Sequence, residues 1–139
     1  MTNIENDVFS AVATATRTEF PGIYMVGEYL PIPASFPAVM LYEADNYVIR
    51  EGSTIRIDDF VRVMYSVSVF SNKTSGKKSE AKAIADFIDN EMRKLGFTRT
   101  MRMQVPNLAD ATIYRLESRY EAVVGDGQTD GTYMIYQTY

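Results

Sequence analysis

Hydrophobic positions alternate strictly in residues 60–70, which predicts a β-strand with one buried side. The alternating positions are apolar or aromatic, namely Val61, Val63, Tyr65, Val67 and Val69. Because successive side chains on a strand point to opposite sides, these five share one side of it. We expect that side to face the core.

After a polar loop at residues 71–78, the hydrophobic period changes from 2 to about 3.6, which predicts an amphipathic helix over residues 79–95. We expect Ser79 to be the N-cap, and Gly96 to take the left-handed conformation that follows many helices. Phe97 then packs back on Met92. The predicted apolar stripe consists of Ala81, Ile84, Ala85, Ile88, Met92 and Leu95.

The N-terminal segment predicts another helix that ends before the Phe-Pro-Gly sequence at residues 20–22. Residues 2–5 read Thr-Asn-Ile-Glu, the pattern of a capping box, in which the threonine and the glutamate satisfy free amides of the first turn. The predicted apolar stripe of this helix consists of Ile4, Val8, Ala11, Val12 and Ala15.

The remaining hydrophobic segments predict strands at residues 23–30, 38–42, 97–105, 111–124 and 132–139. Three prolines in residues 31–37 exclude the middle of a sheet and predict a loop or extended arm. Residues 43–59 are polar, with only weak alternation. We therefore expect one α+β domain over residues 1–139, in which two helices pack on a largely antiparallel or mixed sheet of about six strands.

Composition argues against most kinds of catalytic site. The chain has no cysteine, which excludes disulfides, thiolate zinc sites and cysteine nucleophiles. It also has no histidine, the usual general base and a common metal ligand. We therefore predict a non-enzymatic protein without a metal or cofactor.

The formal net charge is −4 and the isoelectric point is near 4.8, with basic residues scattered along the chain. Tight DNA binding is therefore not expected. No apolar segment is long enough to span a membrane, and the N-terminal segment does not resemble a secretion signal. We expect the protein to be made in a cytoplasm or assembled there, without a membrane partner.

Two loops contain residues that superficially suggest ligand binding. Asp126, Gln128 and Asp130 alternate in a glycine-rich segment, but a calcium loop would carry glutamate where this chain has Gln137. Lys73, Lys77 and Lys78 flank Gly76 without the sequence pattern of a phosphate-binding loop. A hairpin turn and a solvated loop are the favoured interpretations.

Charged residues alternate on one side of the predicted strand at 111–124 and form what we call the charged ladder, Arg115, Glu117, Arg119 and Glu121. On a solvated strand such a pattern needs no functional explanation, because exposed ion pairs contribute only about 0–1 kcal/mol each. In a protein that packs beside copies of itself, the same pattern would set the register between subunits. The sequence leaves both interpretations open.

Aromatic residues are abundant near the C-terminus. The chain has ten tyrosines, and Tyr133, Tyr136 and Tyr139 exceed what one side of a sheet can bury. Amphipathic aromatic side chains are enriched at protein interfaces. We therefore include these three tyrosines with the charged ladder as candidate subunit or partner contacts.

About half of the chain, residues 60–124, resembles the tail terminator proteins of long-tailed bacteriophages, also called tail completion or tail-to-head joining proteins. The resemblance lies in the order and spacing of sequence segments, since each segment alone is generic. The segments are VSVFSN at 67–72, SEAKAIADFID at 79–89, KLGF at 94–97, RT at 99–100, PN at 106–107 and ATIYRLESRYE at 111–121. Residues 21–59 match less clearly.

The resemblance implies a small α+β subunit that forms a ring, usually a hexamer, on the last ring of the tail tube. Such a ring ends tube polymerisation, and the neck of the DNA-filled head docks on it. Its implied partners are its own copies, the tail tube protein and a neck or head-completion protein, while DNA passes through the lumen without tight binding. The implied location is the virion, at the junction of head and tail.

Two alternatives remain at the level of sequence. The protein could instead be a neck or head-completion connector, which differs only in the partner that it binds. A second alternative, from another class, is a small-molecule-binding protein or an enzyme that works with carboxylates or tyrosine. Buried acids with perturbed pKa values in a deep pocket would favour that class.

Overall fold

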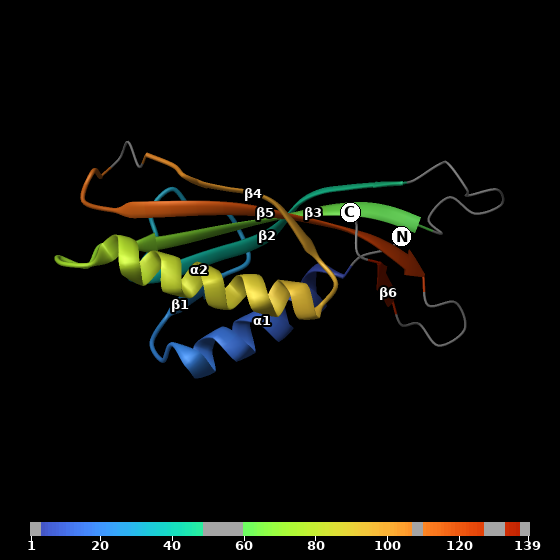
Figure 1. The fold of residues 1–139 in the computed structure, drawn as a ribbon, viewed down its shortest axis with the longest axis horizontal. Helices are drawn as coiled ribbons and strands as arrows, with labels where there is room; N and C mark the ends of the chain where they lie inside the picture. Colours follow the sequence, from blue (N-terminus) through green and yellow to red (C-terminus); the bar gives the residue numbers. More distant parts are fainter. Residues whose placement is uncertain (1–3, 49–59, 107–109, 127–132, 137–139) are drawn as a thin grey trace.

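The computed structural model describes residues 4–48, 60–106, 110–126 and 133–136. Two helices and six strands follow one another in the order α1, β1, β2, β3, α2, β4, β5, β6 (Figure 1). The helices are α1 (Glu5–Glu19) and α2 (Lys77–Lys94). The strands are β1 (Tyr24–Val26), β2 (Ala38–Val48), β3 (Phe60–Ser71), β4 (Thr98–Gln104), β5 (Tyr114–Asp126) and β6 (Tyr133–Tyr136).

The six strands form one mixed sheet in the order β1-β2-β3-β5-β4, and β6 also pairs with β5. Only β1 and β2 run parallel among these pairs, and the others are antiparallel. The two long strands β3 and β5 form the centre, with Tyr65 opposite Tyr120. The predicted α+β class, with two helices and about six strands, is confirmed.

Both helices lie on the same face of the sheet, which we call the helix face (Figure 1). The five alternating residues of β3 all point to this face and are buried, as predicted. The predicted stripe of α2 is buried too, except for half-buried Leu95. Phe20 packs edge-on against Phe87 at a centroid distance of 5.6 Å, which joins α1 to α2.

The start of α2 corrects one prediction. The helix begins at Lys77, and its N-cap is Gly76 in the left-handed conformation (φ 86°), so Ser79 lies inside the first turn. Glu80 instead accepts a hydrogen bond of 2.6 Å from the hydroxyl of Ser71 at the end of β3. A left-handed glycine therefore leads the loop into the helix, and the N-cap makes no side-chain hydrogen bond.

The end of α2 agrees with prediction. Gly96 has a φ of 101°, and its amide donates to the carbonyl of Arg93. The amide of Phe97 donates to the carbonyl of Met92, which completes a Schellman motif. Phe97 and Met92 are both buried in the main core cluster. This glycine turn directs the chain from α2 into β4.

The start of α1 differs from the predicted capping box. The N-cap is Ile4 and makes no side-chain capping bond, while Thr2 lies outside the described residues. A carboxylate oxygen of Glu5 accepts a 2.6 Å hydrogen bond from the backbone amide of Glu43 in β2. The stripe of α1 also turns slightly from the predicted one, since Ala11 is exposed while Ala13 and Thr16 are buried.

Two strand lengths were wrong. β1 covers only three residues of the predicted 23–30 segment, and β2 continues to Val48, six residues beyond the predicted end. The polar extension of β2 pairs with β3 through Tyr47↔Arg62, after a register shift between Glu43 and Asp45. Pairing with a long hydrophobic strand thus overrides the weak local pattern.

Candidate functional site

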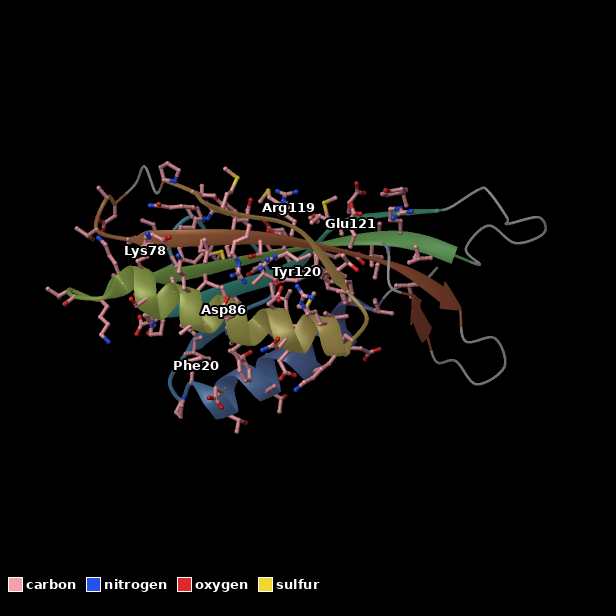
Figure 2. The ribbon with its side chains drawn as sticks, in the orientation of Figure 1. Phe20, Lys78, Asp86, Arg119, Tyr120 and Glu121 are labelled. Carbon is pink, nitrogen blue, oxygen red and sulfur yellow. The ribbon has the colours of Figure 1, made fainter. Side chains whose placement is uncertain are left out.

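The charged ladder lies on the face of the sheet that carries no helix, which we call the open face. Register places Arg115, Glu117, Arg119 and Glu121 there, whereas Tyr120 between them points into the core. Figure 2 shows Tyr120 on the helix side of β5, with Arg119 and Glu121 on the opposite side. The alternation in sequence thus brings all four predicted residues together.

These four side chains are more covered than a freely solvated strand would leave them. Their relative exposures are 16% for Arg115, 13% for Glu117, 38% for Arg119 and 23% for Glu121. Neighbouring residues of the same chain therefore hold much of the ladder in place. Among the four, Arg119 is the most exposed to solvent.

Glu117 is the centre of the ladder. Its Oε1 accepts from Arg115 Nη2 at 3.3 Å and, at 3.5 Å each, from the hydroxyls of Ser66 and Ser68 on β3. Its Oε2 lies 3.7 Å from Arg119 Nη2. These contacts join Arg115 and Arg119, one rung on each side, to the carboxylate of Glu117, and they tie β5 to β3.

Arg115 is held by aromatic rings as well as by charge. Its guanidinium lies 5.4 Å from the ring centroid of Phe70 and 6.0 Å from that of Tyr29, within cation–π range. Its Nη2 also donates to Ser68 at 3.4 Å. Tyr29 belongs to the loop between β1 and β2, so this loop partly covers the Arg115 end of the open face.

A small second core lies under the same loop. It contains buried Ala38, Met40, Phe70 and Ile113, with partly buried Leu30 and Phe36 packed against it. The proline-rich segment at 31–37 therefore serves as a cover on the open face. This role was not predictable from the segment itself, which contains only a loop signal.

The other end of the ladder is more open. Arg119 Nη1 lies 3.7 Å from the sulfur of Met64, and Glu121 lies 3.8 Å from Arg62 on β3. On the same face, Tyr47 of β2 lies opposite Arg62 at this end and is 46% exposed. Met103 of β4 lies opposite Glu117, at the middle of the ladder, and is 52% exposed. Charged and apolar side chains are therefore mixed at this end.

Two of the three candidate tyrosines, Tyr133 and Tyr136, are the first and last residues of β6. Strand β6 pairs with β5 through Val123↔Tyr136 and Asp126↔Tyr133, next to the Glu121 end of the ladder. The side chains of Tyr133 and Tyr136 are outside the description, and so is all of Tyr139. Their contribution to an interface stays a prediction.

The helix face contains a polar cluster that sequence analysis missed. Asp89 of α2 accepts from Tyr120 at 2.9 Å and from Arg93 at 2.7 Å, and Arg99 of β4 lies 3.6 Å away. Burial opposes ionisation of Asp89, but the bonds from Arg93 and Tyr120 and the charge of Arg99 hold its pKa below its usual value. The only sequence signal was an arginine four residues after an aspartate beside the apolar stripe.

A second polar group joins α1, β2 and β3. Glu43 accepts from the hydroxyl of Tyr65 and from Asn46, each at 3.3 Å. Burial raises the pKa of Glu43, with a further contribution from the charge of Glu5. Burial likewise raises the pKa of Tyr65, helped by the same carboxylates. These acids hold the fold together through internal hydrogen bonds.

Of the two loops that superficially suggest ligand binding, the lysine loop lies within the described residues and most of the calcium-like segment does not. Within the described residues, no group of three carboxylates is arranged to hold a metal ion. Gln128 and Asp130 of the calcium-like segment lie outside that part of the chain. Lys77 donates to the carbonyl of Thr112 at 3.2 Å, while Lys73 and Lys78 are exposed. Neither described helix has the length and apolarity of a membrane span.

Comparison of the chain with models of known protein families found no match, and comparison with curated protein sequences found no similar protein.

Proposed function

We propose that this protein is a non-enzymatic structural component of a virion, which forms a ring of six copies on the tail tube of a long-tailed bacteriophage. The ring ends tube polymerisation and joins the tail to the head or neck. The proposal starts from the sequence resemblance over residues 60–124. The structural observation that carries it is the half-buried charged ladder on the open face.

The ladder suits lateral packing because it is already ordered in the single chain. Contacts to Glu117, Phe70 and Tyr29 fix Arg115, so little side-chain freedom remains to be lost on association. Alternating positive and negative charges reject a neighbour that is shifted by one rung, because like charges would then meet. Arg119, the most exposed rung, is the residue that a neighbour reaches most easily.

Microscopy of the purified protein tests the ring directly. Negative-stain images should show rings with a central hole, and native mass spectrometry should give six times 15.7 kDa, about 94 kDa. If assembly needs a template, the ring should appear on adding tail tube protein. Monomers or dimers under both conditions would contradict the proposal.

A matched pair of charge reversals separates assembly from folding. Arg119→Glu should abolish the ring but keep the circular dichroism of the folded protein, because it places like charges across the contact. Lys82→Glu makes the same change in net charge at an exposed position of α2 and should assemble normally. If Arg119→Glu forms normal rings, the ladder stabilises only its own subunit and does not set the contact between subunits.

The proposal also predicts weak binding to DNA. Six copies carry six times −4, a formal charge of −24, which favours passage of DNA without arrest. At near-physiological salt, the Kd for duplex DNA should be no tighter than about 1 μM, the tight end of the usual non-specific range. Tighter binding with a steep salt dependence would indicate a DNA-contacting neck component.

A further inference from the structure

The two outer edges of the sheet differ in whether their backbone groups are satisfied. Beyond its short pairing with β1, the outer edge of β2 is sealed, which means that carboxylates of the same chain accept hydrogen bonds from its backbone amides. The amide of Glu43 donates to Glu5, and the amide of Asn46 donates to Asp45 at 2.9 Å. Sealed amides of this kind discourage the addition of another strand.

The opposite edge, formed by β4, receives no such hydrogen bonds from the described residues in its second half. The amide of Val105 donates to the carbonyl of Arg115 on β5 at 3.0 Å. Because amides alternate in direction along an antiparallel strand, those of Arg102 and Gln104 point away from β5. Neither backbone bonds to another described element, so this edge is open.

The open stretch is short and bounded on both sides. A register shift between Arg99 and Met101 ends it on one side, and Pro106, which has no amide hydrogen, ends it on the other. The regular segment is therefore residues 101–105, with Met103 in the middle. The side chain of Met103 is 52% exposed on the open face.

We propose that the β4 edge pairs with the β4 edge of a second copy, antiparallel and about a two-fold axis at Met103. The two sheets then become continuous. In this register Arg102 lies opposite Gln104 of the second copy, and the outward backbone groups of each such pair exchange two hydrogen bonds. The two Met103 side chains meet at the axis and bury each other.

Charge selects this register over its neighbour. A pairing centred on Arg102 would place two arginines opposite each other, which is unfavourable. In the register centred on Met103, each Arg102 lies opposite the neutral Gln104 of the second copy. Asp86 of the same chain still pairs with Arg102 at 2.7 Å. Among the described strands, the stretch of β2 beyond β1 is the other long sheet edge, and its amides are already bonded to Glu5 and Asp45, so the β4 edge of a second copy is the better partner.

This contact is independent of the proposed ring. A ring requires a head-to-tail contact between different surfaces, whereas the β4 contact is two-fold and closes with two copies. If both contacts form together, the β4 contact links two rings. If the ring covers the β4 edge in the virion, the β4 contact forms only in the free protein.

Single-cysteine variants test both the contact and its register, since the natural chain has no cysteine. Met103→Cys should oxidise rapidly to a disulfide-linked pair of twice 15.7 kDa, about 31 kDa, on a denaturing gel. Facing residues at such a position lie close enough for a disulfide. Gln104→Cys and the exposed loop variant Asn72→Cys should cross-link at least several-fold more slowly. The gel counts linked pairs whether or not a ring also forms.

Sedimentation equilibrium gives the second measurement. We expect the natural protein to have twice the mass of Met103→Lys, whether the unit that doubles is the monomer or the ring, because an ammonium group at this edge blocks strand pairing. Asn72→Lys is the matched control and should associate normally. Equal cross-linking of Met103→Cys and Asn72→Cys, or unchanged association of Met103→Lys, would overturn the proposal. Faster cross-linking of Gln104→Cys would overturn the register.

Discussion

The hydroxyl of Tyr120 donates a 2.9 Å hydrogen bond to Oδ1 of Asp89, which joins the central strand β5 to α2 within the core. Tyr120 is fully buried and Asp89 is nearly so. Burial and the bond to Asp89 raise the pKa of Tyr120, so it remains a donor at any physiological pH. This pair therefore fixes the position of the helix on the sheet.

Removing that hydroxyl should destabilise the fold. Tyr120→Phe leaves a buried carboxylate with one donor fewer, and hydrogen bonds to charged groups contribute about 1.5–3 kcal/mol. Urea unfolding at neutral pH should show a loss of that size. Tyr114→Phe is the matched control, because Tyr114 is also a mostly buried tyrosine of β5 but its hydroxyl makes no hydrogen bond to the described residues. Equal losses in both variants would contradict the role of Asp89.

The penalty of Tyr120→Phe should depend on pH. The pKa of Asp89 is lowered on folding from its ordinary 3.8, so its ionised state stabilises the fold above that value. This stabilisation is lost as pH falls through the still lower pKa of the folded state. The difference between the variant and the natural protein should therefore shrink in strong acid. A difference that grows there would mean that Asp89 is neutral in the fold.

Truncating the core of α2 should be more costly than truncating its exposed side. Ile88 is fully buried, so Ile88→Ala should cost about 2–5 kcal/mol through lost burial and a cavity. Asp86 is exposed but pairs with Arg102, so Asp86→Ala should cost at most about 1 kcal/mol. Asn90→Ala, at an exposed position of α2 without an ion-pair partner among the described residues, should be nearly neutral. Thermal unfolding of the three variants gives the comparison.

Neutralising Glu43 should stabilise the protein at neutral pH. Its pKa is raised on folding from 4.5, so the fold favours the protonated form and loses stability as pH rises through the folded-state value. Glu43→Gln stays neutral and should gain stability at pH 7, by less than about 1 kcal/mol because the side chain is partly solvated. The gain should vanish below the unfolded-state value of 4.5.

Glu28→Gln removes an exposed carboxylate in the loop after β1 and should show no comparable gain. Thermal melts of both variants at acidic and neutral pH measure the effect. Destabilisation of Glu43→Gln at neutral pH would show that the ionised carboxylate is needed to hold Tyr65.

Substitution of the two arginines of the ladder should lower the stability of the protein by different amounts. Arg115 packs against two aromatic rings and is 16% exposed, whereas Arg119 is 38% exposed. Arg115→Ala should cost about 2 kcal/mol through lost packing and cation–π contact. Arg119→Ala should cost less than about 1 kcal/mol. The reverse order in urea unfolding would mean that the loop over Arg115 is not part of the stable fold.

Local signals were sufficient for the central unit of β3, α2, β4 and β5. Strict alternation defined the buried side of β3, and a period near 3.6 defined that of α2. Gly96 marked the end of the helix because its left-handed conformation is accessible to glycine at little cost. Such signals fail where pairing with another segment determines the secondary structure. The polar half of β2 is a strand because it pairs with β3.

By itself, the sequence determined the α+β class, the inward sides of the main elements and the alternation of the charged ladder, because these depend on periodicity along one strand or helix. Only the tertiary structure decided that the loop before β2 roofs Arg115, that Tyr120 meets Asp89, and that β4 has an open edge whereas β2 is sealed. Those relations join residues far apart in the chain. They arise from packing and from the direction of backbone amides, which no local pattern encodes.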